Sequence, residues 1–365
     1  MTKKIVGYIV IIALFVGSFF GIFYAVKYSR VENDKNMIDD YKEQIEDLTD
    51  SNNQKDQEIE DLLDNVKYND FEFEGNTLVS YTGSDPVVII PSSYSIDENG
   101  NFIEGNDYTV TAIKDGTSLG DGVFNDCSSL NVVYIPNTIT KIGNNTFNDC
   151  VNLTTVCFES NSQLIEIGEY AFYNCENLIS ITLPSGIENI GSNAFNCCES
   201  LIKITIPSSV ENLGDHVFTN CINLLSIDFG ENIQIVSIED GLFYSCDSLL
   251  KISLPSSVTS IGDTVFTGCD NLKEITIPSS VVSIGDFVFS GCTSLTDIIF
   301  PSSVTTIGNQ IFNNCSSLSN IEIMATTPPT LDNGPYNADN DPSVTPPLTQ
   351  IQVPSESVAL YKTAT

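Results

Sequence analysis

A single pattern recurs along most of the chain and constrains its fold more than any other feature. Cysteines stand 23 or 25 residues apart, with a Phe three residues before each and a Leu three residues after each. Six residues after each cysteine there is always Ile or Val. The cysteines of the pattern are Cys127, Cys150, Cys175, Cys198, Cys221, Cys246, Cys269, Cys292 and Cys315. A period of this length predicts a solenoid, in which each unit stacks on the next.

Each unit is too short to bury its own apolar face, so neighbouring units must stack and share a core. The run Leu-x-x-Ile-x-Ile-Pro alternates as a strand that proline ends. The run Val-x-x-Ile-Gly predicts a second short extended segment, and Phe-x-x-Cys predicts a turn or a piece of 3₁₀ helix. The two longer units begin at Cys150 and Cys221, replace the proline with Glu159 and Gly230, and carry two extra loop residues. The predicted fold is a β-solenoid of short parallel strands in 23-residue units.

These residues resemble the BspA-like leucine-rich repeats, a family found mainly in surface proteins of bacteria and of some anaerobic protists. The resemblance covers residues 77–365. The segment TLVSYTGSDPVVIIP (residues 77–91) is similar to the family's usual first unit, and IQVPSESVALYKTAT (residues 351–365) is similar to its usual C-terminal cap. A polar insertion at residues 92–107 is one departure from the family pattern. The cap is another, because it continues past the equivalent of Tyr361 in the family and here is either shortened or cut.

The resemblance implies a division of the solenoid into three parts. They are an N-terminal cap over residues 77–112, nine leucine-rich repeats over residues 113–323, and a C-terminal cap over residues 324–365.

The first residues predict a membrane anchor. Residues 5–26 are 22 uncharged, mostly apolar residues, which at about 1.5 Å rise each can cross a hydrocarbon core of about 30 Å. We expect residues 1–4 to be a cytoplasmic tail and the solenoid to lie outside the cell, because all folded mass follows the span. Lys27 and Arg30 on the far flank weaken this orientation. A cleaved signal peptide is the alternative, although no convincing cleavage site follows.

A coiled-coil stalk is predicted over residues 31–67, which contain no Gly or Pro and fit a heptad repeat. Five of the six a positions hold β-branched apolar residues, which favours a parallel two-stranded coil, and Asn52 at the remaining a position is a residue type that fixes register. Asp34 and Lys55 occupy d positions and weaken the pattern. We predict a parallel homodimer through this segment, with a single amphipathic helix as the alternative, and a short linker at residues 68–76.

The cysteines are expected to fill the core rather than to bind metal or form disulfides. Zinc sites need closely spaced pairs such as C-x-x-C. Strands about 4.8 Å apart hold stacked β-carbons beyond the disulfide distance of about 3.8 Å. The cysteine column therefore predicts small buried residues beneath the Phe column. Cys157 and Cys197 fall outside the column, and Cys157 lies at an outward strand position, where we expect an exposed thiol.

Charge and composition exclude several functions. The chain has 14 Lys+Arg against 48 Asp+Glu, a formal net charge of −34, whereas a nucleic-acid binder needs clustered cations. His216 is the single histidine, and no nucleophile-elbow, phosphate-loop or metalloprotease motif appears. We therefore expect no enzyme activity, no metal and no cofactor.

What remains to carry a function is the variable surface of a constant core. Two positions per strand, five and seven residues after each cysteine, face outward and vary. Two lysines stand centrally in a hydroxyl-rich set of such positions, and acids gather towards its C-terminal end. We call this candidate ligand-binding set the strip; it comprises Lys203, Thr205, Ser226, Asp228, Lys251, Ser253, Glu274 and Thr276. The alternative for any one of these residues is an ordinary solvated sheet, because Ser and Thr suit exposed strands.

The sequence thus predicts a single-pass cell-membrane protein whose solenoid binds a protein or glycan on another cell or matrix. The family resemblance implies the adhesion part of this prediction, whereas the anchor, stalk and solenoid follow from the residues. A structural spacer without a dedicated ligand is one alternative. A module of an enzyme or receptor whose partner domain lies beyond residue 365 is another.

Overall fold

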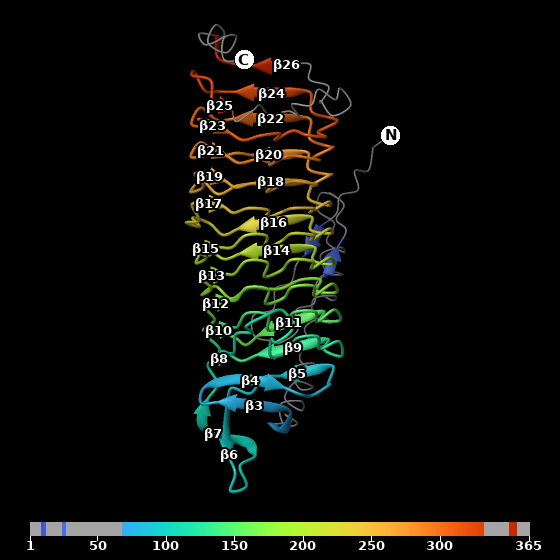
Figure 1. Ribbon diagram of the computed structural model, residues 1–365, viewed down its shortest axis with the longest axis vertical. Coiled ribbons are helices and arrows are strands. Elements are labelled where there is room, and N and C mark those ends of the chain that lie inside the picture. Colours follow the sequence, from blue (N-terminus) through green and yellow to red (C-terminus); the bar gives the residue numbers. More distant parts are fainter. Residues whose placement is uncertain (1–8, 12–23, 27–67, 332–349, 356–365) are drawn as a thin grey trace, which may run out of the picture.

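The chain forms an elongated solenoid of stacked turns. The computed structural model describes residues 9–11, 24–26, 68–331 and 350–355. Figure 1 shows the turns following the sequence from one end of the stack to the other, with two columns of short strands along its length. The β-solenoid with repeats of about 23 residues is therefore confirmed.

The first column of strands holds the Leu-x-x-Ile-x-Ile segments, as predicted. These strands pair in parallel with a register that places equivalent residues of successive units side by side, such as Lys203 beside Ser226. The pairing falls into four groups. They are β5 (Val87–Ile89), β9 (Val132–Ile135) and β11 (Thr155–Phe158); β14 (Lys203–Ile206) and β16 (Ser226–Phe229); β18 (Lys251–Ser253) and β20 (Glu274–Thr276); and β22 (Asp297–Phe300), β24 (Asn320–Ile323) and β26 (Gln350–Gln352).

The second column holds the Val-x-x-Ile-Gly segments, which form two-residue strands. One sheet contains β8 (Ala112–Ile113), β10 (Lys141–Ile142), β12 (Glu166–Ile167), β13 (Asn189–Ile190) and β15 (Asn212–Leu213). A separate sheet contains β17 (Ser237–Ile238), β19 (Ser260–Ile261), β21 (Ser283–Ile284), β23 (Thr306–Ile307) and β25 (Thr330–Leu331). The column is therefore interrupted between β15 and β17, and we call this boundary between two turns the seam.

Phenylalanine rings stack along the core. The nine rings from Phe124 to Phe312 are almost completely buried. Successive centroids lie 5.0 to 5.9 Å apart, and the planes are tilted by at most 17°. Offset stacking of this kind adds to the free energy gained from burying the rings. The ladder of identical side chains predicted from the repeat is thus the central element of packing.

The cysteine column has the structural role predicted for it, together with a hydrogen bond that the sequence did not reveal. From Cys150 to Cys315, each Sγ donates to the carbonyl oxygen of a Phe in the preceding turn, over 2.9 to 3.3 Å. All eleven cysteines are free thiols. Burial raises the pKa of the column thiols, to about 11 for Cys127 and about 12 for Cys315. These thiols therefore stay protonated and unreactive at neutral pH.

The two cysteines outside the column have different explanations. Cys197 directly precedes Cys198 at a position where every turn has a left-handed backbone, with φ of 60°. The expectation of an exposed thiol at Cys157 is wrong, because that side chain is 6% exposed and clusters with Tyr134 of the preceding strand. Burial raises the pKa of Cys157 to about 12.

The linker predicted at residues 68–76 is instead part of the N-terminal cap. Residues Tyr68–Asp70 form a 3₁₀ turn, and β3 (Phe71–Glu74) pairs antiparallel with β4 (Thr77–Tyr81). Phe71 and Phe73 are buried, and the Phe73 ring stacks on Tyr94 at 4.3 Å. The segment therefore closes the open end of the apolar core.

The polar insertion at residues 92–107 forms most of an antiparallel hairpin at the same end of the stack (Figure 1). Its strands are β6 (Ser93–Ile96) and β7 (Phe102–Thr109). The buried Tyr94 anchors the hairpin, because its hydroxyl donates to the Gly75 carbonyl oxygen at 2.7 Å.

The predicted anchor and stalk fall mostly outside the described residues. Within residues 5–26, the described pieces β1 (Ile9–Ile11) and β2 (Tyr24–Val26) pair as antiparallel strands, which differs from the continuous helix expected there. In the described parts of the chain, no helix has the length and apolar character needed to span a membrane. The coiled coil predicted at residues 31–67 lies entirely outside the described residues.

Candidate functional site

The eight residues of the strip lie on four strands of the first column, as their alternation with core residues predicts. β14 pairs with β16 and β18 pairs with β20, in a register that sets equivalent outward residues side by side. The inward residues Ile204, Ile227 and Ile252 are buried, whereas every residue of the strip is exposed or half-buried. The solenoid therefore presents the strip on one outward face, as two pairs of strands.

The two lysines of the strip differ in their surroundings. The Lys203 ammonium lies 2.6 Å from a carboxylate oxygen of Asp228, its diagonal neighbour on the next strand. Lys251 is paired in register with Glu274, yet its ammonium makes no ion pair or hydrogen bond within the described residues. Lys251 is therefore the cation of the strip that is free to meet a ligand.

Six of the eight residues surround one shallow hollow of about 440 Å³ between β16 and β20. They are Ser226, Asp228, Lys251, Ser253, Glu274 and Thr276. The hollow exists because β16 and β18 are not paired, so the outward side chains of the two strands stand apart. Its hydroxyl, carboxylate and ammonium groups suit a polar ligand that offers both donors and acceptors. Lys203 and Thr205 lie outside this lining.

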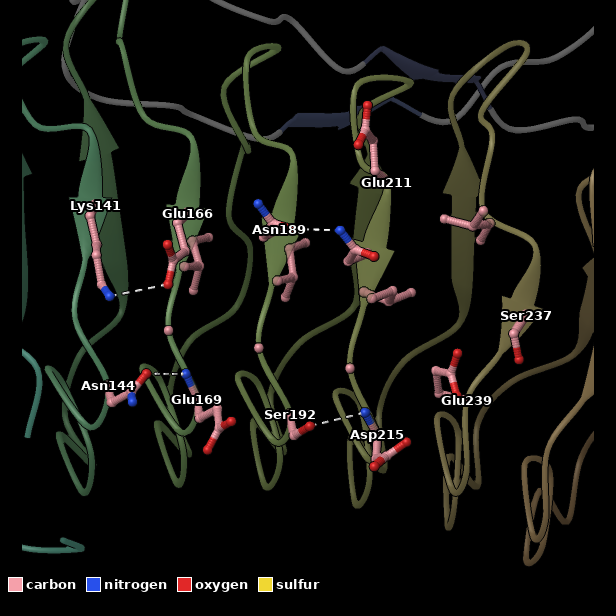
Figure 2. Close-up of a pocket in the computed structure, with 18 of the residues that line it drawn as sticks. Lys141, Asn144, Glu166, Glu169, Asn189, Ser192, Glu211, Asp215, Ser237 and Glu239 are labelled. Carbon is pink, nitrogen blue, oxygen red and sulfur yellow. Dashed lines mark hydrogen bonds and ion pairs between the residues drawn. The ribbon is translucent and has the colours of Figure 1, made fainter. Parts of the chain in front are cut away.

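A second hollow, of about 630 Å³, lies over the second column and extends from β10 to β17 (Figure 2). The sequence interpretation missed it because only outward positions of the first column were compared. Its carboxylates are Glu166, Glu169, Glu211, Asp215 and Glu239. Among the described residues that line the hollow, the one cation is Lys141, which is held by Asp115 at 2.9 Å and by Glu166 at 3.2 Å. The hollow is thus strongly acidic.

Many polar side chains beside this second hollow are occupied by the fold itself. The Asn144 side-chain oxygen accepts from the Glu169 amide at 2.8 Å, and the Ser192 hydroxyl accepts from the Asp215 amide at 3.2 Å (Figure 2). Asp263 does the same for the Asp286 amide further along. In several turns, the residue directly after the glycine of the Val-x-x-Ile-Gly segment therefore links its turn to the next. No group of three His, Cys, Asp or Glu side chains in the described residues could hold a metal ion.

His216 does not belong to a catalytic constellation. It is half-buried in a left-handed turn with φ of 57°, and its Nδ1 lies 3.2 Å from the Thr219 hydroxyl. That hydroxyl donates to the Gly241 carbonyl oxygen at 2.8 Å. The contacts of His216 thus connect adjacent turns.

Comparison with known proteins agrees with this architecture. A sequence model described as the BspA type Leucine rich repeat region matches residues 117–237 and 236–333, in six copies. A leucine-rich repeat protein from Bacteroides ovatus is similar in structure, with 26% identity, 78% of this chain and 74% of that chain covered, and a TM-score of 0.62.

Two further solved structures are similar over most of their length. A leucine rich cell surface protein from Faecalibacterium prausnitzii has 22% identity and a TM-score of 0.44, with 81% of this chain and 96% of that chain covered. The pneumococcal vaccine antigen PcpA has 20% identity and a TM-score of 0.42, with 80% and 88% covered. No curated protein matches the chain.

Proposed function

Because the chain belongs to the family of BspA-type leucine-rich repeat proteins, we propose that it is a non-catalytic binding protein of the cell surface. In this proposal residues 5–26 anchor it in the membrane, residues 31–67 form the stalk, and the solenoid lies outside the cell. The hollow between β16 and β20 binds a protein or glycan of another cell or matrix, as in adhesion. The observation that carries the proposal is the unpaired Lys251 among five other polar residues of the strip.

The chemistry of the hollow limits what the ligand can be. Lys251 offers an ammonium to a carboxylate or sulfate, and Ser226, Ser253 and Thr276 offer hydroxyls that both donate and accept. Asp228 and Glu274 accept hydrogen bonds from sugar hydroxyls or from peptide and lysine N–H groups. A glycan or a protein loop of mixed polarity fits this set, whereas a purely anionic polymer meets the repulsion of a chain with net charge −34.

The test is a binding screen with the full-length chain in lipid nanodiscs against matrix proteins and a glycan array. For any ligand found, Lys251→Ala is expected to weaken binding at least tenfold. Lys273→Ala is the matched control, because Lys273 is an exposed lysine that does not line the hollow. Equal loss in both variants would show that only overall charge matters, and no ligand in a broad screen would overturn the proposal.

A rigid spacer without a dedicated ligand is the second candidate function. Lys203 is already neutralised by Asp228, and hydroxyl side chains are ordinary on an exposed sheet. If the solenoid is only a spacer, deleting one whole 23-residue unit should shorten the molecule and leave adhesion to cells unchanged. A binding site in the hollow predicts loss of activity when the deleted unit contains Lys251, and no loss when it lies elsewhere.

A further inference from the structure

Four aliphatic side chains form an exposed ridge along one corner of the solenoid. Each stands four residues after its cysteine, where the chain leaves the Cys-x-x-Leu turn and enters the first column of strands. We call this set the ridge; it comprises Ile179, Ile202, Leu225 and Leu250, which are 49, 45, 47 and 47% exposed. Four such side chains in consecutive turns make an apolar patch on the order of 300 Å², a size at which exposed patches are often functional.

The ridge is not required by the fold. The other units have polar residues in the same position, and these are Asn131, Thr154, Lys273, Thr296 and Ser319. Each of these units nevertheless has the same buried Leu one residue earlier, from Leu130 to Leu318. The aliphatic residues are therefore confined to four central turns, in a position that the core leaves open.

The backbone under the ridge is well ordered. The Ile202 amide donates to the Ile179 carbonyl oxygen at 3.1 Å, and the Leu225 amide donates to the Ile202 carbonyl oxygen at 2.9 Å. Beside them, the Asn223 side chain donates to the Glu199 carbonyl oxygen in the preceding turn at 2.9 Å. The backbone thus holds Ile179, Ile202 and Leu225 at a regular spacing, and Leu250 follows beyond the boundary at which β16 and β18 are not paired.

Opposite charges flank the ridge. Each turn runs around the solenoid in the same direction, so the order of positions along the chain is also their order across the corner. On the side before the ridge lie the exposed carboxylates Glu199 and Asp247, one residue after their cysteines. On the side after it lie Lys203 and Lys251, in the same two turns. The charge on each of these turns therefore reverses across the ridge.

A two-fold axis parallel to the ridge would bring these opposite charges together. Such an axis places each ridge residue opposite the same residue of the second copy. It also reverses the direction across the ridge, so that in each turn the flank before the ridge in one copy lies opposite the flank after the ridge in the other. A lysine flank of one copy then faces the acidic flank of the other. Interfaces of this isologous kind require a patch that is complementary to itself.

We propose that the ridge is an interface with a second copy of this chain, in which Leu225 packs on its own counterpart and Lys251 faces Asp247 of the partner copy. Lys251 is suited to this because it has no ion pair among the residues that the structure describes. Asp247 is suited because the carboxylate of Asp270 on the following turn repels its charge. Partial burial and this neighbour both raise the pKa of Asp247.

The small area of the ridge indicates how the interface would form. Stable dimers of free molecules bury about 1,200 to 2,000 Å² in total, and the ridge with its flanks is smaller. Two chains already joined by the coiled coil predicted at residues 31–67 would meet at a millimolar effective concentration, at which a weak interface suffices. This inference does not rest on ligand binding in the hollow, because in the paired state Lys251 faces Asp247 of the partner copy instead of a ligand.

Cross-linking of the full-length chain in nanodiscs tests the proposal. Under mild oxidation, Leu225→Cys is expected to give a disulfide-linked dimer at least tenfold faster than Val282→Cys, an exposed aliphatic residue away from the ridge. The unmodified chain supplies the background, which comes from Cys127 and Cys197, since these two thiols are half-buried and the other nine are buried. Equal rates for Leu225→Cys and Val282→Cys would overturn the proposal, and so would absence of any linked dimer.

Charge exchange gives a second, independent readout on the Leu225→Cys background. Lys251→Asp alone and Asp247→Lys alone are each expected to slow cross-linking several-fold, because each places like charges opposite one another. The double variant is expected to restore the rate, since it merely swaps the two flanks. Failure of the double variant to recover would contradict the two-fold arrangement, whatever the outcome of any ligand screen.

Discussion

Two turns of the solenoid, the first beginning at Cys150 and the second at Cys221, are each longer by two residues. They nevertheless pair with their neighbours in different ways. In the first longer turn, β12 stays paired with β10 of the preceding turn. In the second, β17 pairs only with β19 of the following turn, which leaves the seam beside β15. Insertions of equal length at the same corner therefore do not have equal structural effects.

The two longer turns also differ in the contacts between the loop and the turn before it. In the first longer turn the Asn137 amide donates to the Glu159 carboxylate at 2.9 Å, and the Asn137 side chain donates to the Ser160 carbonyl oxygen at 3.3 Å. In the second, the corresponding positions are Ser208 and Gly230, which have no such side-chain pair. We therefore expect the contact between this carboxamide residue and the carboxylate to help hold the short strand that follows in register with the preceding turn.

The seam is nevertheless bridged by the core and by the first column of strands. Phe218 stacks on Phe243 at 5.9 Å across it, and the Gly230 amide donates to the Ile206 carbonyl oxygen at 2.8 Å. At the first longer turn, Phe147 and Phe172 are closer, at 5.1 Å. In a solenoid the stability is roughly a sum of unit and interface terms, so the seam is the place where the stack should separate first.

The largest expected effect comes from removing a ring beside the seam. Phe243→Ala should lower the free energy of unfolding by about 3 to 5 kcal/mol, because it leaves a cavity in the core. Phe172→Ala is the matched variant and should cost a similar amount. In chemical denaturation we expect two separate transitions for Phe243→Ala and a single one for Phe172→Ala. Two transitions in both variants, or one in both, would remove the distinction between the two turns.

A smaller effect is expected where the loop of the second longer turn meets its neighbour. A Cβ added at Gly230 would lie 2.5 Å from the Ser208 amide nitrogen and 3.1 Å from the Ile206 carbonyl oxygen. Gly230→Ala should therefore cost about 1 to 3 kcal/mol, as overpacking does. Gly186→Ala is the control, since its Cβ would have one ordinary contact, at 3.5 Å. A stability loss as large for Gly186→Ala would mean that the close approach at Gly230 does not set the cost, because the loss of backbone entropy in the unfolded chain favours Ala over Gly at both positions.

These two turns also show what the sequence could and could not predict. The ladders of Phe124 and its equivalents were predictable because identical side chains in register must stack. The seam was not, because Glu159 and Gly230 both appear simply as replacements of a proline. The positions with a left-handed backbone conformation could not be predicted either. Tyr170 and Phe287 occupy such positions with φ of 55° and 57°, although bulky residues rarely adopt this conformation.

The candidate site, too, could be predicted from the sequence only in part. The outward direction of the strip followed from the alternation of each strand, whereas the hollow beside Lys251 depends on β16 and β18 not pairing. The burial of Cys157 could not be anticipated from its own strand, because Tyr134 of the neighbouring strand contributes to it. Alternation predicts which way a side chain points, and only the arrangement of neighbouring turns determines what covers it.

The first longer turn should become more like the second when its loop contact is removed. Glu159→Ala takes away the acceptor of the Asn137 amide, at an expected cost of about 1 kcal/mol. Hydrogen exchange should accelerate at the Ile165 amide, which donates to the Thr140 carbonyl oxygen at 2.8 Å. Glu188→Ala, a change at an exposed carboxylate elsewhere, is the control. Unchanged exchange at Ile165 in Glu159→Ala would show that the loop contact does not hold β12 in place.

The smallest effect should come from the ion pair that spans the seam on the first column. Lys203 lies on β14 and Asp228 on β16, one strand on each side of the boundary. Their side chains are 42 and 55% exposed, so Lys203→Ala should cost only about 0.2 to 1 kcal/mol, and the loss should vanish at high salt. Lys251→Ala should leave stability unchanged because Lys251 has no ion pair to lose in the described part of the chain. Measured in low salt, a difference between the two lysine variants would show that a surface contact reinforces the seam. Equal stability would mean that the Phe218–Phe243 stack and the β14–β16 pairing hold the two turns together across the seam without help from the ion pair.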